Sequence, residues 1–80
     1  MTVTVLVFAA YAEALGAPEV SVTVPAGSTI ADVLAEVRAL PGGTRIPEVP
    51  LLARNQRYAA LSDPVEAADE IAVIPPVAGG

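Results

Sequence analysis

The residues with the clearest chemical use are the last six of the 80-residue chain, Pro75-Pro76-Val77-Ala78-Gly79-Gly80. Adjacent prolines fix φ and lack an N–H, so the chain must leave a sheet or helix there as an extended arm. The two glycines have no Cβ and fit a slot too narrow for other residues. A frayed end of small residues is the alternative interpretation. The pattern predicts an arm that brings the carboxylate of Gly80 beside a partner's reacting atoms.

A carboxylate on such an arm becomes reactive only when another protein activates it. Adenylation converts it to an acyl adenylate, from which AMP is a good leaving group, and a sulfur nucleophile can then replace AMP. The product is a terminal thiocarboxylate, which a second partner can hold in place so that proximity replaces a random collision. The sequence therefore predicts a carried reactive group at Gly80.

The composition excludes most chemistry that the chain could perform by itself. Cysteine and histidine are absent, and the cations are four arginines with no lysine. This removes the thiolate nucleophile, the usual general base and the Schiff-base amine. We expect a protein that is not an enzyme, with no catalytic residues and no bound cofactor.

Charge and hydropathy limit the partners. The net charge is −5, so a nucleic-acid partner is not expected, because phosphate neutralisation needs a basic face. No run approaches the length of a membrane span, and the apolar run Val5–Ala10 lacks the basic segment of a signal peptide. We expect a cytoplasmic protein without membrane contact.

Acidic residues near the C-terminal end could in principle bind a hard cation. Asp63, Glu66, Asp69 and Glu70 lie close together in sequence, but their spacing has no EF-hand pattern. A solvated acidic turn is the interpretation we favour, and no metal site is predicted.

The first half of the chain predicts strand, helix and strand. Residues 2–8 are rich in β-branched side chains, with apolar residues at both parities, which favours a central strand. Alanine-rich residues 9–15, followed by Gly16 and Pro18, predict a helix of about two turns. Residues 19–24 alternate strictly, which predicts a half-buried strand near an edge.

The second half predicts a long helix, a hairpin and a last strand. Thr29 and Asp32 form a capping pair before an apolar stripe: Ile30, Val33, Leu34, Val37 and Leu40. Residues 44–50, with two prolines, predict an irregular crossing loop. Residues 51–54 and 57–60 predict a hairpin around Asn55-Gln56, and residues 70–74 predict the last strand. The order of elements predicts an α+β domain in two layers.

Beyond these patterns, the chain resembles the MoaD/ThiS family of ubiquitin-like β-grasp sulfur carriers, and within it the branch that serves molybdopterin synthase. The residues that carry the resemblance are Val7-Phe8-Ala9 with Glu13 and Gly16, Thr29–Leu34, Asn55, Leu61, and Asp69-Glu70 leading through the last strand into the tail. The resemblance implies a mixed sheet with one main helix packed across one face. It also implies a β-grasp domain at residues 1–74 and an extended diglycine tail at residues 75–80.

The resemblance further implies the partners and the pathway. Gly80 would be adenylated by an E1-like (MoeB-like) enzyme that uses ATP, and converted to a thiocarboxylate. The tail would then enter the large (MoaE-like) subunit of molybdopterin synthase and supply dithiolene sulfur for the molybdenum cofactor. Phe8, Arg54 and Arg57 are candidate interface residues, although exposed arginines are more often solvated than paired.

Two other functions stay open at this point. The same terminal chemistry serves carriers for thiazole, cysteine or transfer-RNA thiolation and ubiquitin-like modifiers. A β-grasp interaction module with an inert tail is the third possibility.

Overall fold

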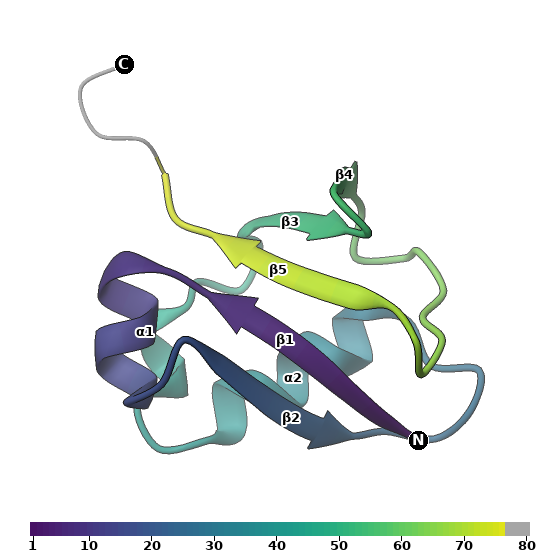
Figure 1. The fold of residues 1–80 in the computed structure, drawn as a ribbon, viewed down its shortest axis with the longest axis horizontal. Coiled ribbons are helices and arrows are strands. Elements are labelled where there is room, and N and C mark those ends of the chain that lie inside the picture. The colour runs from purple at the N-terminus through teal and green to yellow at the C-terminus, as the bar shows by residue number, and fades with distance from the viewer. Residues whose placement is uncertain (77–80) are drawn as a thin grey trace.

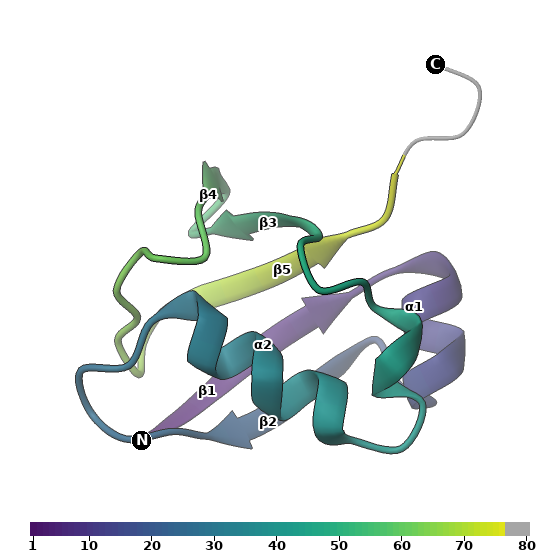
Figure 2. The same ribbon diagram turned by 180° about the vertical axis from the view of Figure 1, so that it is seen from behind.

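The computed structural model describes residues 1–76 as one five-stranded mixed sheet with helices packed against it (Figures 1 and 2). The elements, in chain order, are β1 (Thr2–Val7), α1 (Ala9–Leu15), β2 (Glu19–Thr23), α2 (Ile30–Ala39), the 3-10 turn η1 (Gly43–Arg45), β3 (Leu51–Arg54), β4 (Arg57–Ala59) and β5 (Glu70–Ile74). The strand order is β2-β1-β5-β3-β4. Among these described strands, β1 and β5 form the one parallel pair. The α+β class, the β-grasp arrangement and the single main helix across one face are confirmed.

Strand β1 separates its side chains into two sets. Val3, Val5 and Val7 are buried in the core, whereas the residues between them point to the other face of the sheet. The apolar residues at both parities correctly indicated an internal strand, since β1 lies between β2 and β5. Strand β2 is an edge strand, as its alternation predicted.

Helix α2 supplies the second layer of the core. The Thr29 N–H donates a hydrogen bond to the Asp32 carboxylate at 2.9 Å, which satisfies a free donor at the helix start. The stripe Ile30, Val33, Leu34 and Val37 is buried against the sheet. Leu40, expected as the last member of the stripe, lies just past the end of the helix and is half-buried.

The crossing segment after α2 is more ordered than the sequence predicted. Residues 44–50 were expected to be irregular, but Gly43–Arg45 form one 3-10 turn and Ile46 is fully buried. The Arg38 Nε donates to the Ile46 carbonyl at 2.8 Å. Gly42 makes this turn possible, because its φ is +84° and a Cβ there would collide with the Ala14 carbonyl. The apolar side chain of Ile46 was the signal in the sequence for this order, and the prediction of an irregular loop did not use it.

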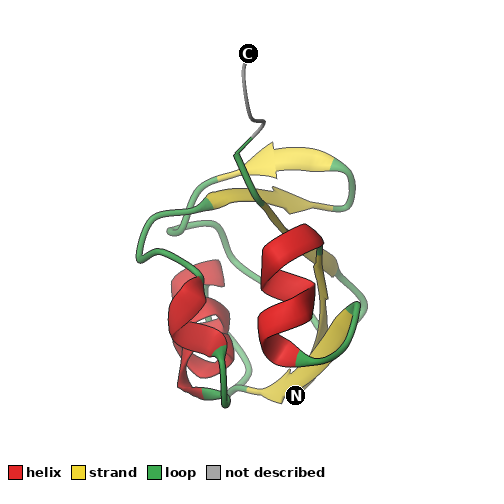
Figure 3. Ribbon diagram, turned by 90° about the vertical axis from the view of Figure 1, so that its left-hand side faces the viewer, coloured by secondary structure: helices red, strands yellow, loops and turns green. Residues whose placement is uncertain are grey.

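The hairpin and the last strand form where the sequence predicted them. Asn55 and Gln56 have φ values of +51° and +69°, the backbone that a two-residue turn between right-twisted strands needs. Strand β4 ends at Ala59, one residue earlier than expected. Strand β5 lies third of five, and Figure 3 shows the helices stacked on one side of the sheet. Within residues 1–76, no helix has the length and apolar character needed to cross a bilayer.

Candidate functional site

The structure describes the base of the predicted arm but not its end. Pro75 is half-buried and Pro76 exposed, directly after β5. Val77, Ala78, Gly79 and Gly80 lie outside the described residues, so their roles remain predictions. Strand β5 ends at Ile74, and the division into a domain at residues 1–74 and a tail at residues 75–80 stays a prediction.

The base of the arm leaves from an internal strand. Strand β5 is hydrogen-bonded to β1 on one side and to β3 on the other, with Leu51 opposite Ile74. Ile71 and Val73 are each 1% exposed in the core. Because both neighbours and the core hold β5, the point where the chain leaves the sheet at Pro75 is fixed relative to the rest of the domain.

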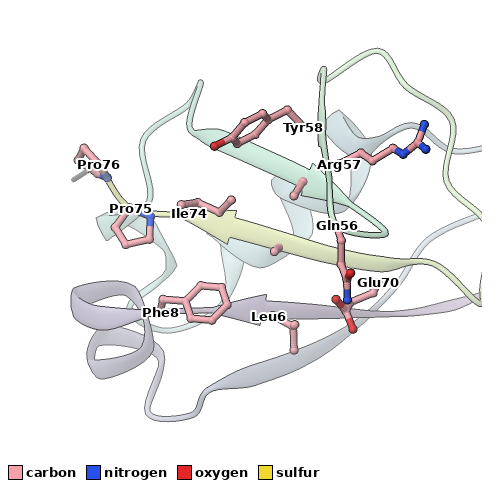
Figure 4. Close-up of a pocket in the computed structure, with 11 residues that line it drawn as sticks. Leu6, Phe8, Gln56, Arg57, Tyr58, Glu70, Ile74, Pro75 and Pro76 are labelled. Atoms are coloured by element: carbon pink, nitrogen blue, oxygen red, sulfur yellow. The ribbon is translucent and has the colours of Figure 1, made fainter. Parts of the chain in front are cut away.

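The face of the sheet opposite the helices carries an uncovered apolar surface. One row of paired residues crosses four strands, and its members are Leu6, Ala72, Ala53 and Tyr58. Two alanines in the middle of the row, with larger side chains at each end, produce a hollow. We call this surface the open-face groove, lined by the row together with Phe8, Ile74, Pro75 and Pro76, with Gln56, Arg57 and Glu70 at its rim (Figure 4).

The polarity of the open face changes along β1 and β5. The first pair of the β1–β5 ladder is Thr4 and Glu70, which are polar and exposed. Toward the end of the strands come Phe8 and Ile74, beside the prolines of the arm. The apolar part of the face therefore lies next to the point from which the arm leaves.

The groove has the properties of a protein-binding surface. Its volume is about 910 Å³, and it lies on the outside of the sheet rather than in the interior. Tyr58 is 79% exposed and Phe8 is 46% exposed. Exposed aromatic residues around small ones, with charges only at the rim, are typical of the centre of an interface. Within residues 1–76 no three acidic side chains gather as metal ligands.

The two arginines predicted for the interface have different surroundings. The Arg54 Nη1 donates to the Pro64 carbonyl at 2.8 Å, and its Nε lies 3.4 Å from Asp69 Oδ2. This guanidinium is therefore already engaged within the chain. Arg57 is exposed at the rim of the groove. The predicted contact of either arginine with a partner stays a prediction.

Asp69 is the centre of the polar contacts around Arg54. The Glu66 N–H donates to Asp69 Oδ2 at 2.8 Å, and the Asn55 Nδ2 donates to Asp69 Oδ1 at 2.9 Å. The hydrogen bond from the Glu66 N–H, and after it the one from Asn55, lower the pKa of Asp69. Burial opposes them, and the charge of Arg54 adds a smaller lowering of the pKa. The acidic residues that the sequence placed in a solvated turn are thus held by hydrogen bonds within the chain. Asp63 also accepts one, from the Ala60 N–H.

The sequence analysis named Phe8, Arg57 and the two prolines, which all line the groove, but it did not name the other lining residues. Leu6 shares the parity of Phe8 in the first strand, which was a usable signal for a second exposed apolar residue. Tyr58 was the other signal, since a large aromatic residue in a short edge strand has little core to enter. Ala53 and Ala72 could not be found, because only the register of β3 and β5 places them side by side.

Comparison with known proteins gives the chain a family context. The family model described as "ThiS family" matches residues 5–80. The molybdopterin synthase sulfur carrier subunit of Arabidopsis thaliana is 38% identical over 77 residues, which cover 95% of this chain and 80% of that protein.

Solved structures agree on the fold. The crystal structure of SAMP1 from Haloferax volcanii superposes with a TM-score of 0.87 at 29% identity, covering 100% of both chains. A complex of subunits 1 and 2 of the molybdopterin-converting factor from Helicobacter pylori contains a chain with a TM-score of 0.72 at 22% identity, again covering 100% of both chains.

The lowered pKa of Asp69 predicts a specific loss of stability in acid. Because the folded pKa lies below the unfolded one, the contribution is full above about pH 4 and is lost as the pH falls through the folded pKa. We expect Asp69→Asn to lower the unfolding midpoint at pH 7, with the difference from the unmodified protein shrinking below about pH 4. Thermal unfolding followed from pH 7 to pH 2 measures this.

The matched control is Glu36→Gln on the exposed side of α2. It removes one acidic charge without removing these hydrogen bonds. A difference between Asp69→Asn and the unmodified protein that stays constant across the pH range would contradict the assignment.

Proposed function

Since the chain belongs to the ThiS family, we propose that it is the sulfur-carrier subunit of a molybdopterin synthase, in which Gly80 carries the sulfur as a thiocarboxylate. The observation that carries the proposal is the 38% identity, over 95% of the chain, to a molybdopterin synthase sulfur carrier subunit. The open-face groove beside the base of the arm fits this role. The carrier is a non-catalytic subunit, and the catalytic groups belong to its partners.

The loading reaction takes place in two steps on the carboxyl group of Gly80. An E1-like partner joins the carboxylate to the α-phosphate of ATP, which releases pyrophosphate and leaves an acyl adenylate. A sulfide equivalent from a sulfur donor then attacks the carbonyl carbon, and AMP leaves. One C–O bond is broken and one C–S bond is formed, with no change in the oxidation state of the carbon. ATP is thus a substrate of the partner, and a cytoplasmic location would give access to it.

This chain contributes position rather than catalysis. Strand β5 fixes where the arm begins, and Pro75 and Pro76 restrict the directions that it can take. A partner that covers Phe8, Leu6 and Ile74 would gain apolar burial next to the arm. Binding of the groove would therefore hold the thiocarboxylate near the partner's reacting atoms.

The second subunit is proposed from the comparison with the two-subunit complex. The structure from Helicobacter pylori is described as a complex of subunits 1 and 2 of a molybdopterin-converting factor. We assign the role of subunit 1 to this chain and expect a large, MoaE-like subunit as its partner.

A ubiquitin-like modifier is the second candidate function. It is favoured by the full-length likeness to SAMP1 of Haloferax volcanii at 29% identity. The products distinguish the two functions. A modifier leaves Gly80 in an amide bond to another protein, whereas a carrier releases its sulfur and regains a free carboxylate.

The first test of the carrier role is sulfur loading. The protein is incubated with ATP, an E1-like activating enzyme and a sulfur donor, and its intact mass is measured. We expect a fraction in which one oxygen is replaced by sulfur, and no such fraction after deletion of Gly80. The Ala78→Ser variant keeps the tail length and both glycines, so it should load like the unmodified protein. Absence of the sulfur-containing mass under these conditions would contradict the proposal.

The second test concerns the groove. Phe8→Asp places a charge in the apolar part of the open face, and aspartate is well accepted at this helix N-cap position. We expect its affinity for the large synthase subunit to fall at least about 30-fold, roughly 2 kcal/mol. Calorimetric titration of the two purified subunits measures the affinity.

Thr2→Asp is the control for charge. It adds the same charge to the open face at the far end of β1, and Thr2 is exposed. We expect little change in its affinity for the large subunit. Equal effects of the two substitutions, or no effect of Phe8→Asp, would show that the groove is not the contact surface.

A further inference from the structure

Tyr58 forms one side of the open-face groove, and the strand that carries it is weakly held. Tyr58 lies on β4, a strand of three residues at the edge of the sheet, hydrogen-bonded only to β3 among the described strands. Its side chain is 79% exposed, so its own packing contributes little to its position. The position of Tyr58 beside Ala53, its partner on β3, therefore depends on the contacts that hold the β3–β4 hairpin.

Asn55 connects that hairpin to β5. Its backbone N–H donates to the Glu70 carbonyl at 2.8 Å. Its Oδ1 accepts from the Glu70 N–H at 2.9 Å, and its Nδ2 donates to Asp69 Oδ1 at 2.9 Å. One amide side chain thus uses its acceptor and its donor on two successive residues, 14 and 15 positions away. We call the two side-chain contacts, to Asp69 and to the Glu70 N–H, the hairpin latch.

The latch and the turn are separable properties of Asn55. The turn needs a residue that tolerates φ of +51°, which asparagine and glycine both do. The latch needs a side chain that is both donor and acceptor, which glycine lacks. Gln56 is next in the same turn at φ of +69°, and neither side-chain contact of the latch involves it. The two turn residues therefore provide a matched pair.

We propose that Asn55 is a positioning residue for partner recognition, because its latch to Asp69 and Glu70 sets where Tyr58 stands in the groove. The inference rests on the proposed function, in which the groove binds the large synthase subunit. Asn55 lies beyond the groove and acts through the hairpin. Arg54 reinforces the latch through its own contacts with Asp69 and Pro64. A groove with its wall already in place loses less freedom on binding, which favours affinity.

The test compares Asn55→Gly with Gln56→Gly. Both variants have glycine in the same turn at positive φ, but only the first removes the side-chain latch. We expect Asn55→Gly to bind the purified large subunit about tenfold more weakly than the unmodified protein. Because Gln56 itself lies at the rim of the groove, Gln56→Gly is the control for glycine in the turn in the hydrogen-exchange measurement and not in the affinity measurement. Equal affinities of Asn55→Gly and the unmodified protein would overturn the proposal.

A double-mutant cycle separates positioning from general loss of stability. If Asn55 acts through Tyr58, Asn55→Gly should cost about twofold or less in a Tyr58→Ala background. A full tenfold loss in that background would overturn the assigned route. Hydrogen exchange adds a direct readout, since the Glu70 amide should exchange faster in Asn55→Gly and at an unchanged rate in Gln56→Gly. An unchanged rate at Glu70 in Asn55→Gly would also contradict the latch.

Asn55→Asp covers the case in which Asn55→Gly does not fold. It keeps the acceptor for the Glu70 N–H and tolerates positive φ, but it replaces the donor to Asp69 with a second carboxylate. We expect weaker binding of the large subunit at pH 7, and unchanged binding would count against the latch. Sulfur loading and binding of the unmodified protein report on the proposed function, whereas differences among these variants report on Asn55.

Discussion

The parallel pairing of the first and last strands is the constraint on which the rest of the structure depends. It places β5 inside the sheet, between β1 and β3, although β5 is the last element before the C-terminal residues. Core burial of Ile71 and Val73 then fixes the direction in which the chain leaves. The same pairing brings Leu6 beside Ala72 and so builds the middle of the open-face groove. The point where the chain leaves the sheet at Pro75 and the position of the groove both follow from this strand register.

The two faces of the sheet have different roles: one forms the core that stabilises the domain, and the other carries the proposed recognition surface. The valines of β1 and the stripe of α2 form the core, as expected for a small domain that must bury its apolar residues efficiently. The opposite face keeps apolar residues uncovered only near Pro75 and Pro76, and polar residues at its far end. A chain without cysteine, histidine or lysine has few reactive groups of its own. In the proposed function, its contribution to chemistry is to place one carboxyl group at a partner.

Local signals in the sequence predicted most of the fold. Alternation, the Thr29–Asp32 cap and the Asn55-Gln56 turn each depend on neighbours close in sequence, and each was confirmed. The groove was only partly predictable, because Ala53 and Ala72 become neighbours through a pairing between distant strands. The engagement of Arg54 with Asp69 also needed the folded turn. Side chains brought together by register, rather than by local periodicity, were the ones that sequence reasoning missed.

Methyl cross-saturation NMR on the complex with the proposed large synthase subunit would show whether the open-face groove is the contact surface. The carrier is deuterated with labelled methyl groups, and the protonated large subunit is irradiated. We expect loss of intensity at Leu6, Ala72 and Ile74, with no loss at Ala35 and Ala39 on the exposed side of α2. Saturation of Ala35 and Ala39, with the methyl groups of Leu6, Ala72 and Ile74 unaffected, would show that the groove is not the contact surface.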